Sequence, residues 1–296
     1  AALADDPAKR LRRRALATVA GLVLVGGGAA GYALTTPDPT TQCDVRDALA
    51  GVWDPSTRAA VEARFTSLGL PFADQAFRHA AAQLDAYAAR LQHLLQATCE
   101  ARTRGLRKGR ALELQVDCGE RLRSELAAVT QVLANADARA VERVGQTIAR
   151  LPPVEPCGEP GSLLAAAEQT QAPEDPALAA RVRTQAPRLA AARAELDAGH
   201  HDRGRELARE IVDEAERLGH APLLAEALVL LGVAELACGD YPGSAATLLR
   251  GYSVAEAARH DRTAGEAAIR LVYLHGERLH DLARAHLQRH VPQHLD

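Results

Sequence analysis

The apolar residues of this chain form one uninterrupted run near its start and helical patterns after it. Residues 15–34 contain no charged side chain. Residues 75–103 lack proline and glycine, and residues 111–133 repeat leucine and valine every three or four positions, a spacing typical of amphipathic helices. With shorter helices expected at 56–68 and 137–150, the pattern predicts an all-α fold.

Local signals set the limits of these helices. Asp54 precedes the first short helix and Asp137 the second, and aspartate is a favoured residue at a helix start. Pro152 ends the second short helix because proline cannot continue it. Gly105 and Gly109 bound a turn between the two long helices, which are therefore expected to form a helical hairpin.

The apolar run at 15–34 is long enough to cross a membrane. At 1.5 Å per residue it makes roughly 30 Å of helix, the thickness of a hydrocarbon core. Residues 1–14 carry five basic side chains against two acidic ones, so they predict a cytoplasmic basic juxtamembrane segment. A cleavable signal peptide is the alternative, and both interpretations export residues 35–296.

Two glycines in this expected transmembrane helix suggest self-association. Gly27 and Gly31 have the GxxxG spacing that lets two membrane helices approach closely. The competing explanation is a composition rich in small residues. A phosphate-binding loop at Gly26–Gly31 is set aside, because the run lacks the lysine and the flanking strand of such loops.

Residues 35–157 are predicted to form a cysteine-bearing helical domain in which the single tryptophan, Trp53, anchors the core. An exported location permits disulfides, and the absence of CxxC spacing makes a zinc site a poor fit. Four of the five cysteines lie in this domain: Cys43, Cys99, Cys118 and Cys157. The helical hairpin favours pairing Cys99 with Cys118 and Cys43 with Cys157, while free buried thiols remain the alternative.

After a proline-containing linker at 158–177, residues 178–296 predict tetratricopeptide-like helical repeats. At an offset of forty residues, Gly199 matches Gly239 and His220 matches His260. Stacked helix pairs form a concave surface lined by the first helix of each pair. We expect a protein or peptide partner in this groove, unless its residues face solvent or a neighbouring domain. The expected groove residues are Arg193, Glu226, Val229, Val233, Glu266, Ile269 and Tyr273.

Charge and composition exclude several function classes. The net charge is −3, and the body beyond the basic start is acidic, so nucleic acid is not an expected partner. His286, His290 and His294 step by four, but Pro292 interrupts them and no thiol or carboxylate accompanies them, so no metal site is predicted. Neither His200 nor His201 has a nucleophile at a recognisable spacing. No catalytic residue and no cofactor is therefore predicted within this chain.

Short segments along the chain resemble a known family. After the basic run and the span come Gly-Val-Trp-Asp at 51–54, Leu-Asp-Ala-Tyr-Ala at 84–88, Thr-Cys-Glu-Ala at 98–101, Asp117-Cys118, and Leu151-Pro152 with Cys157. This order resembles the carboxy-terminal half of transmembrane serine/threonine protein kinases abundant in myxobacteria. Gly119 departs from the leucine that the family tends to have there.

The resemblance implies a cytoplasmic kinase domain, with its ATP and Mg²⁺, upstream of this chain. Because the chain begins at Ala1 and contains no methionine, we expect it to be part of a longer protein. The expected function is an extracytoplasmic sensor or scaffold in a single-pass protein of the bacterial inner membrane, with its C-terminal region periplasmic. The alternative is an exported or membrane-anchored tetratricopeptide adaptor without kinase activity.

Overall fold

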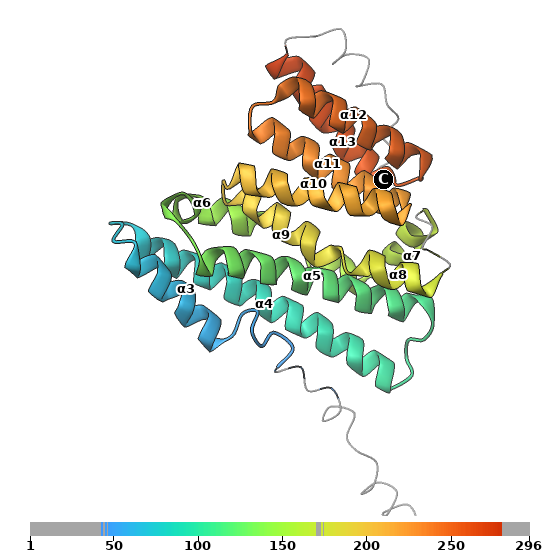
Figure 1. The fold of residues 1–296 in the computed structure, drawn as a ribbon. Helices are drawn as coiled ribbons and strands as arrows, with labels where there is room; N and C mark the ends of the chain where they lie inside the picture. The colour runs from blue at the N-terminus through green and yellow to red at the C-terminus, as the bar shows by residue number, and fades with distance from the viewer. Residues whose placement is uncertain (1–42, 44, 46, 170–172, 174, 280–296) are drawn as a thin grey trace, which may run out of the picture. The chain divides into compact units, whose positions relative to one another are not determined.

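The computed structural model describes residues 43, 45, 47–169, 173 and 175–279. All regular elements in these ranges are helical (Figure 1). The expected transmembrane helix at 15–34, with Gly27 and Gly31, lies outside them. Within the described part of the chain, no helix combines the length and apolar composition needed to cross a bilayer.

The first half of the described chain is a helical bundle. Its helices lie within one or two residues of the predicted limits: α3 (Pro55–Ser67), α4 (Ala73–Thr103), α5 (Arg110–Ala134) and α6 (Ala138–Ala149), followed by the 3-10 turn η1 (Glu155–Gly158). The capping predictions are confirmed. The Asp54 side chain accepts a hydrogen bond from the Thr57 amide at 2.8 Å, and Asp137 accepts one from Ala140 at 2.8 Å.

The bundle core combines large apolar side chains with many alanines. Phe65, Leu84 and Leu126 are fully buried and belong to one continuous cluster. Trp53 belongs to the same cluster, as predicted, and its indole Nε1 donates a hydrogen bond to Asp85 Oδ1 at 2.8 Å. Its polar edge is therefore satisfied while its rings contribute to the core.

The disulfide pairing differs from the predicted one. Cys118 is bonded to Cys157, with their Cα atoms 5.7 Å apart, and Cys43 and Cys99 are disulfide-bonded as well. The helical hairpin itself is present as α4 and α5, but the pairing of Cys99 with Cys118 is wrong because Gly119, not Cys118, faces α4. A Cβ at Gly119 would lie only 2.9 Å from the Leu95 side chain. Cys118, one residue earlier, is rotated by about 100° around the helix axis. Its side chain therefore points away from Leu95 and can bond to Cys157 in η1.

The segment predicted as a linker is largely helical. Residues Pro160–Gln169 form α7, and α8 (Pro176–Arg183) begins at the end of the expected linker. The Asp175 side chain caps α8 by accepting from the Ala177 amide at 2.9 Å. Single short helices of this kind lack the long periodic pattern that would reveal them in the sequence.

The second half consists of helices joined by short turns at the predicted offset of forty residues. They are α9 (Ala186–Asp197), α10 (His201–Leu218), α11 (Ala221–Ala237), α12 (Tyr241–Ala257) and α13 (Asp261–Tyr273), extended by the π-helical turn η2 (Leu274–Arg278). Gly199 and Gly239 occupy equivalent turns with φ of 94° and 83°. His220 and His260 are the N-cap residues of α11 and α13.

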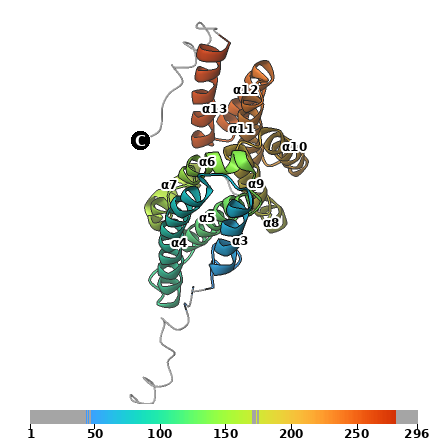
Figure 2. The same cartoon turned by 90° about the vertical axis from the view of Figure 1, so that its left-hand side faces the viewer.

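Helix α9 connects the two halves. Ala190, Ala194 and Ala198 on one side of it belong to the bundle core, whereas Leu189 and Leu196 belong to the core formed with α10 and α11. In both views it runs between α5 and α10 (Figure 1, Figure 2). The bundle and the helix pairs are therefore packed directly against each other within the described residues.

Candidate functional site

The predicted groove residues lie on α9, α11 and α13, but the structure divides them into groups with different surroundings. Arg193 forms an ion pair with Glu125 of the bundle helix α5. Glu226 lies 3.7 Å from Arg121 of α5 and 3.8 Å from His260. These two residues face the neighbouring bundle, which was the alternative left open by the sequence.

The electrostatics around Glu226 agree with an internal role. Burial raises the pKa of its carboxyl, but Arg121 and the other nearby positive groups outweigh burial and leave the pKa below its usual value. The carboxylate thus stays ionised and paired at neutral pH. Arg193 and Glu226 help to hold the helix pairs on the bundle.

Val229 is a core residue, contrary to its predicted place in the groove. It is 3% exposed and packs in a cluster with Leu248, Leu271 and Leu274. Helix α11 is covered by α10 on one side and by α12 and α13 on others. Because nearly all of its residues are apolar, periodicity alone cannot tell which of them faces a groove.

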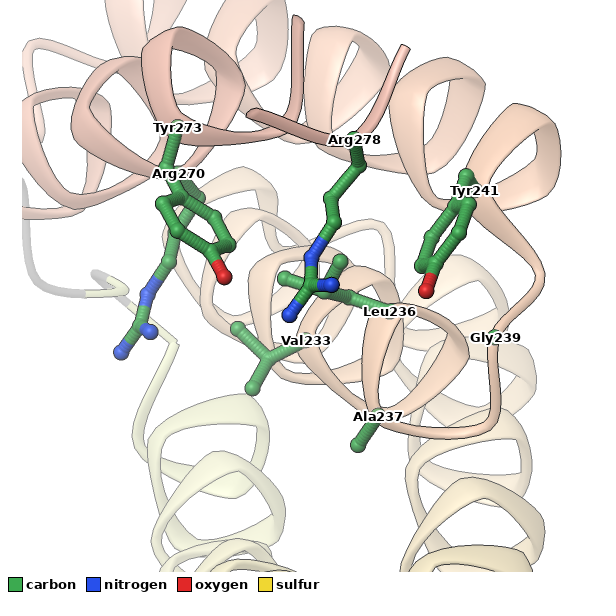
Figure 3. Close-up of a pocket in the computed structure, with 8 residues that line it drawn as sticks. All are labelled: Val233, Leu236, Ala237, Gly239, Tyr241, Arg270, Tyr273 and Arg278. Carbon is green, nitrogen blue, oxygen red and sulfur yellow. The ribbon is translucent and has the colours of Figure 1, made fainter. Parts of the chain in front are cut away.

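Two of the remaining groove residues line one pocket, and a third lies beside it on α13. Val233 and Tyr273 line an open pocket of about 330 Å³ between the C-terminal ends of α11 and α13, and Ile269 lies one helical turn before Tyr273. The pocket is drawn in Figure 3. Its lining residues are Val233, Leu236, Ala237, Gly239, Tyr241, Arg270, Tyr273 and Arg278. We call these residues, together with Ile269, the α11–α13 face.

An arginine held between two tyrosines is the most distinctive feature of this face. The guanidinium carbon of Arg278 lies 5.6 Å from the centre of the Tyr273 ring and 5.8 Å from that of Tyr241. Both distances suit cation–π contacts. The pKa of Arg278 is raised mainly by a hydrogen bond with Tyr273, so the guanidinium remains charged. In Figure 3 its side chain extends between the two rings toward Val233 and Leu236.

The rim of the pocket combines exposed apolar and charged side chains. Ile269 is 65% exposed and Tyr273 is 42% exposed. Glu266, the last of the predicted groove residues, is also exposed and lies 3.8 Å from Arg270. An apolar ridge beside two guanidinium groups can hold a chain that carries both apolar and anionic groups.

Sequence reasoning missed Arg270, Arg278 and Tyr241. Arg278 belongs to the π-helical turn η2, where the geometry departs from the regular α-helical register used for the prediction. Tyrosine offered the better signal, because the chain has only five and two of them flank this arginine. The spacing of Tyr241 and Tyr273 in the sequence does not itself indicate that they meet.

His200 and His201 have structural surroundings. His200 Nδ1 lies 2.6 Å from Glu195, and its Nε2 lies 3.2 Å from Asp137, the N-cap of α6. Burial lowers the pKa of His200, but the hydrogen bonds to the two carboxylates outweigh it and raise the pKa overall. The pKa of His201 is lowered by burial and by Arg143.

Three further observations complete the comparison with the sequence predictions. His286, His290 and His294 lie outside the described residues. Among the residues that are described, no three histidine, cysteine or acidic side chains gather as metal ligands would. Comparison of the chain with protein-family models, with curated proteins and with solved structures gives no match.

Proposed function

We propose that this chain is the extracytoplasmic sensor or scaffold region of a single-pass bacterial membrane serine/threonine protein kinase, and that it binds a protein or peptide partner at the α11–α13 face. The kinase domain, with its ATP and Mg²⁺, would precede Ala1 in the parent protein. The resemblance of the short segments at 51–54 and 84–88 to such kinases supports this assignment. In this proposal α9 to α13 act as tetratricopeptide-like repeats.

The observation that carries the binding role is the exposure of large apolar side chains next to a pocket. Most leucine, isoleucine and valine side chains of α9 to α13 are buried, yet Ile269 and Tyr273 are 65% and 42% exposed one turn apart. An apolar ridge rimmed by charged residues is typical of a protein-interaction surface. Leu249 is also exposed, at 52%, but it lines a different pocket, which contains no arginine.

The disulfides support an exported location. Cys118 and Cys157 are bonded, and Cys43 and Cys99 are disulfide-bonded too. Stable disulfides are characteristic of oxidising compartments such as the bacterial periplasm. This agrees with the membrane orientation proposed from the basic residues before the apolar run at 15–34.

Site-specific photocrosslinking in the parent protein, in its native membrane, tests the binding role. A photoreactive phenylalanine analogue at Tyr273 should give a covalent adduct with a second polypeptide, because this side chain lies on the proposed face. The matched control is Phe72, which is 41% exposed on the bundle side and should give none. Equal adducts at both positions, or none at Tyr273, would argue against a partner at this face.

Coupling to the kinase is tested separately. If partner binding changes the association of the membrane helices, replacing Gly27 and Gly31 with leucine should reduce trans-phosphorylation in membranes, because leucine prevents close helix approach. Replacement of Gly21, in the same apolar run but outside the GxxxG pair, serves as the control. Unchanged phosphorylation in the double variant would contradict coupling through this pair.

A further inference from the structure

We propose that the partner segment is an acidic peptide, whose carboxylate lies over Arg278 and Arg270 and whose neighbouring apolar side chain covers Ile269. This inference rests on the proposed binding function and names the chemistry of the ligand. It follows from three features of the α11–α13 face: two arginines with no acidic residue in the pocket lining, one of these arginines placed between two tyrosine rings, and an exposed isoleucine one helical turn before Tyr273.

The pocket carries two positive charges and no negative one. Arg270 and Arg278 line it, and none of the other lining residues is acidic. Among the described residues, no carboxylate lies within ion-pair distance of Arg278, whereas Arg270 has only the exposed Glu266 at 3.8 Å. A carboxylate from a partner would therefore supply the missing charge, in a chain whose overall net charge is −3.

The arginine is already positioned to receive such a group. The rings of Tyr241 and Tyr273 hold the guanidinium of Arg278 at its sides, as Figure 3 shows, and thus limit its rotation. A planar guanidinium can donate two parallel hydrogen bonds to a carboxylate, and a prearranged one loses less entropy when it does so. The tyrosine hydroxyls are further possible donors at the same pocket.

The surroundings favour a single carboxylate over a polyanion such as a nucleic acid. Glu266 and Glu277 are both exposed on α13 and η2 beside the arginines, and they would repel an extended row of phosphates. Polyphosphate binding needs a broad basic surface. An apolar ridge and two guanidinium groups match a short peptide that carries both acidic and apolar residues.

The spacing of the two contacts suggests the form of the peptide. Ile269 lies one turn before Tyr273, which corresponds to a rise of about 6 Å along α13. The guanidinium carbon of Arg278 lies 5.6 Å from the centre of the Tyr273 ring. An extended peptide advances about 3.3 Å per residue. The apolar and acidic residues of the partner should therefore be about two to three positions apart.

Selection from a displayed library of random peptides tests the proposal. The full chain in detergent micelles is the target, and each selected peptide is then synthesised and titrated against four proteins: wild type, Ile269→Ala, Arg278→Gln and Arg250→Gln. Arg250 is the matched control, an arginine 52% exposed on α12 and paired with Glu216 outside the face. All four proteins should show the same circular dichroism and thermal unfolding, because the altered side chains are exposed.

The proposal expects peptides enriched in aspartate or glutamate that bind at the face. Their affinity should fall at least about tenfold in Arg278→Gln, in line with the loss of a charged hydrogen bond, should fall in Ile269→Ala, and should not change in Arg250→Gln. A peptide in which aspartate and glutamate are replaced with asparagine and glutamine should lose affinity for the wild-type protein to a similar extent. Peptides that depend on Ile269 but are neutral, or are insensitive to Arg278→Gln, would overturn the acidic ligand while leaving the binding function intact. If the affinity of the selected peptides is unchanged by both Ile269→Ala and Arg278→Gln, the proposed binding function at this face is contradicted as well.

Discussion

At Gly232 the backbones of α11 and α12 come so close that a side chain has no room. A Cβ at this position would lie 2.6 Å from Leu248 Cγ and 3.3 Å from the Leu248 backbone nitrogen. Gly145 in α6 is also helical, but a Cβ there would meet nothing within 4 Å. The two glycines therefore separate the effect of packing from the helix propensity of glycine.

Replacing each glycine with alanine should change stability in opposite directions. We expect Gly232→Ala to lower the free energy of unfolding by about 1–3 kcal/mol, because overpacking outweighs the gain in helix propensity. Gly145→Ala should raise it by up to about 1 kcal/mol, because alanine restricts the unfolded chain at no steric cost. Urea unfolding monitored by circular dichroism measures both. Changes of the same sign would mean that the close approach at Gly232 is relieved by small shifts.

At the scale of elements, the sequence predicted the helices better than their contacts. Capping by Asp54 and Asp137 is a local property, and so are the glycine turns, which is why the limits of the bundle helices were predicted closely. The partner of Cys118 depends on how α4, α5 and η1 are rotated against one another. Gly119 fixes that rotation through its contact with Leu95, and helical periodicity contains no such information.

Removal of the Cys118–Cys157 bond should destabilise the bundle. The bond closes a loop with a sequence separation of 39 residues, for which the chain-entropy estimate is about 3–4 kcal/mol. We expect the double change Cys118→Ser and Cys157→Ser to lower the free energy of unfolding by about this amount. Cys238→Ser is the control, because Cys238 is a free thiol and should cost little. Equal stability of the double variant and wild type would show that the bond does not constrain the unfolded chain.

The contact between α6 and the turn before α10 should depend on pH. The two carboxylates around His200 raise its pKa in the folded state. Its contribution to stability is thus fully present below the unfolded value of about 6.5 and is lost as pH rises through the folded value. The apparent melting temperature should fall over this range, and less so in His200→Gln. A fall of equal size in wild type and variant would assign the pH dependence to other groups.

At the scale of the whole molecule, the candidate site shows where sequence reasoning stops. The repeat offset placed Val233, Ile269 and Tyr273 on the correct helices, because turns recur at Gly199 and Gly239. Whether a residue on such a helix faces a groove, the core or the bundle depends on which other helices cover it. Val229 is covered by α12 and α13. Glu226 forms an ion pair with Arg121, which comes from a distant part of the sequence.

Helix α9 makes the bundle a support for the α11–α13 face. Ala190 and Ala194 pack in the bundle core, whereas Leu189 and Leu196 pack in the core of the helix pairs. Arg193 adds an ion pair to Glu125. A bundle that contains the Cys118–Cys157 disulfide thus carries, through α9, the helix pairs that present the face.

Counting thiols in the protein extracted from its native membrane most directly tests the proposal that this chain is an exported, disulfide-bonded binding region. The protein is denatured in the presence of an alkylating reagent, with or without prior reduction, and the alkylation of each cysteine of this chain is read from the masses of its proteolytic peptides. We expect one cysteine, Cys238, to be alkylated without reduction, and all five of the chain's cysteines after it. Alkylation of all five without reduction would contradict both the disulfides and the extracytoplasmic location.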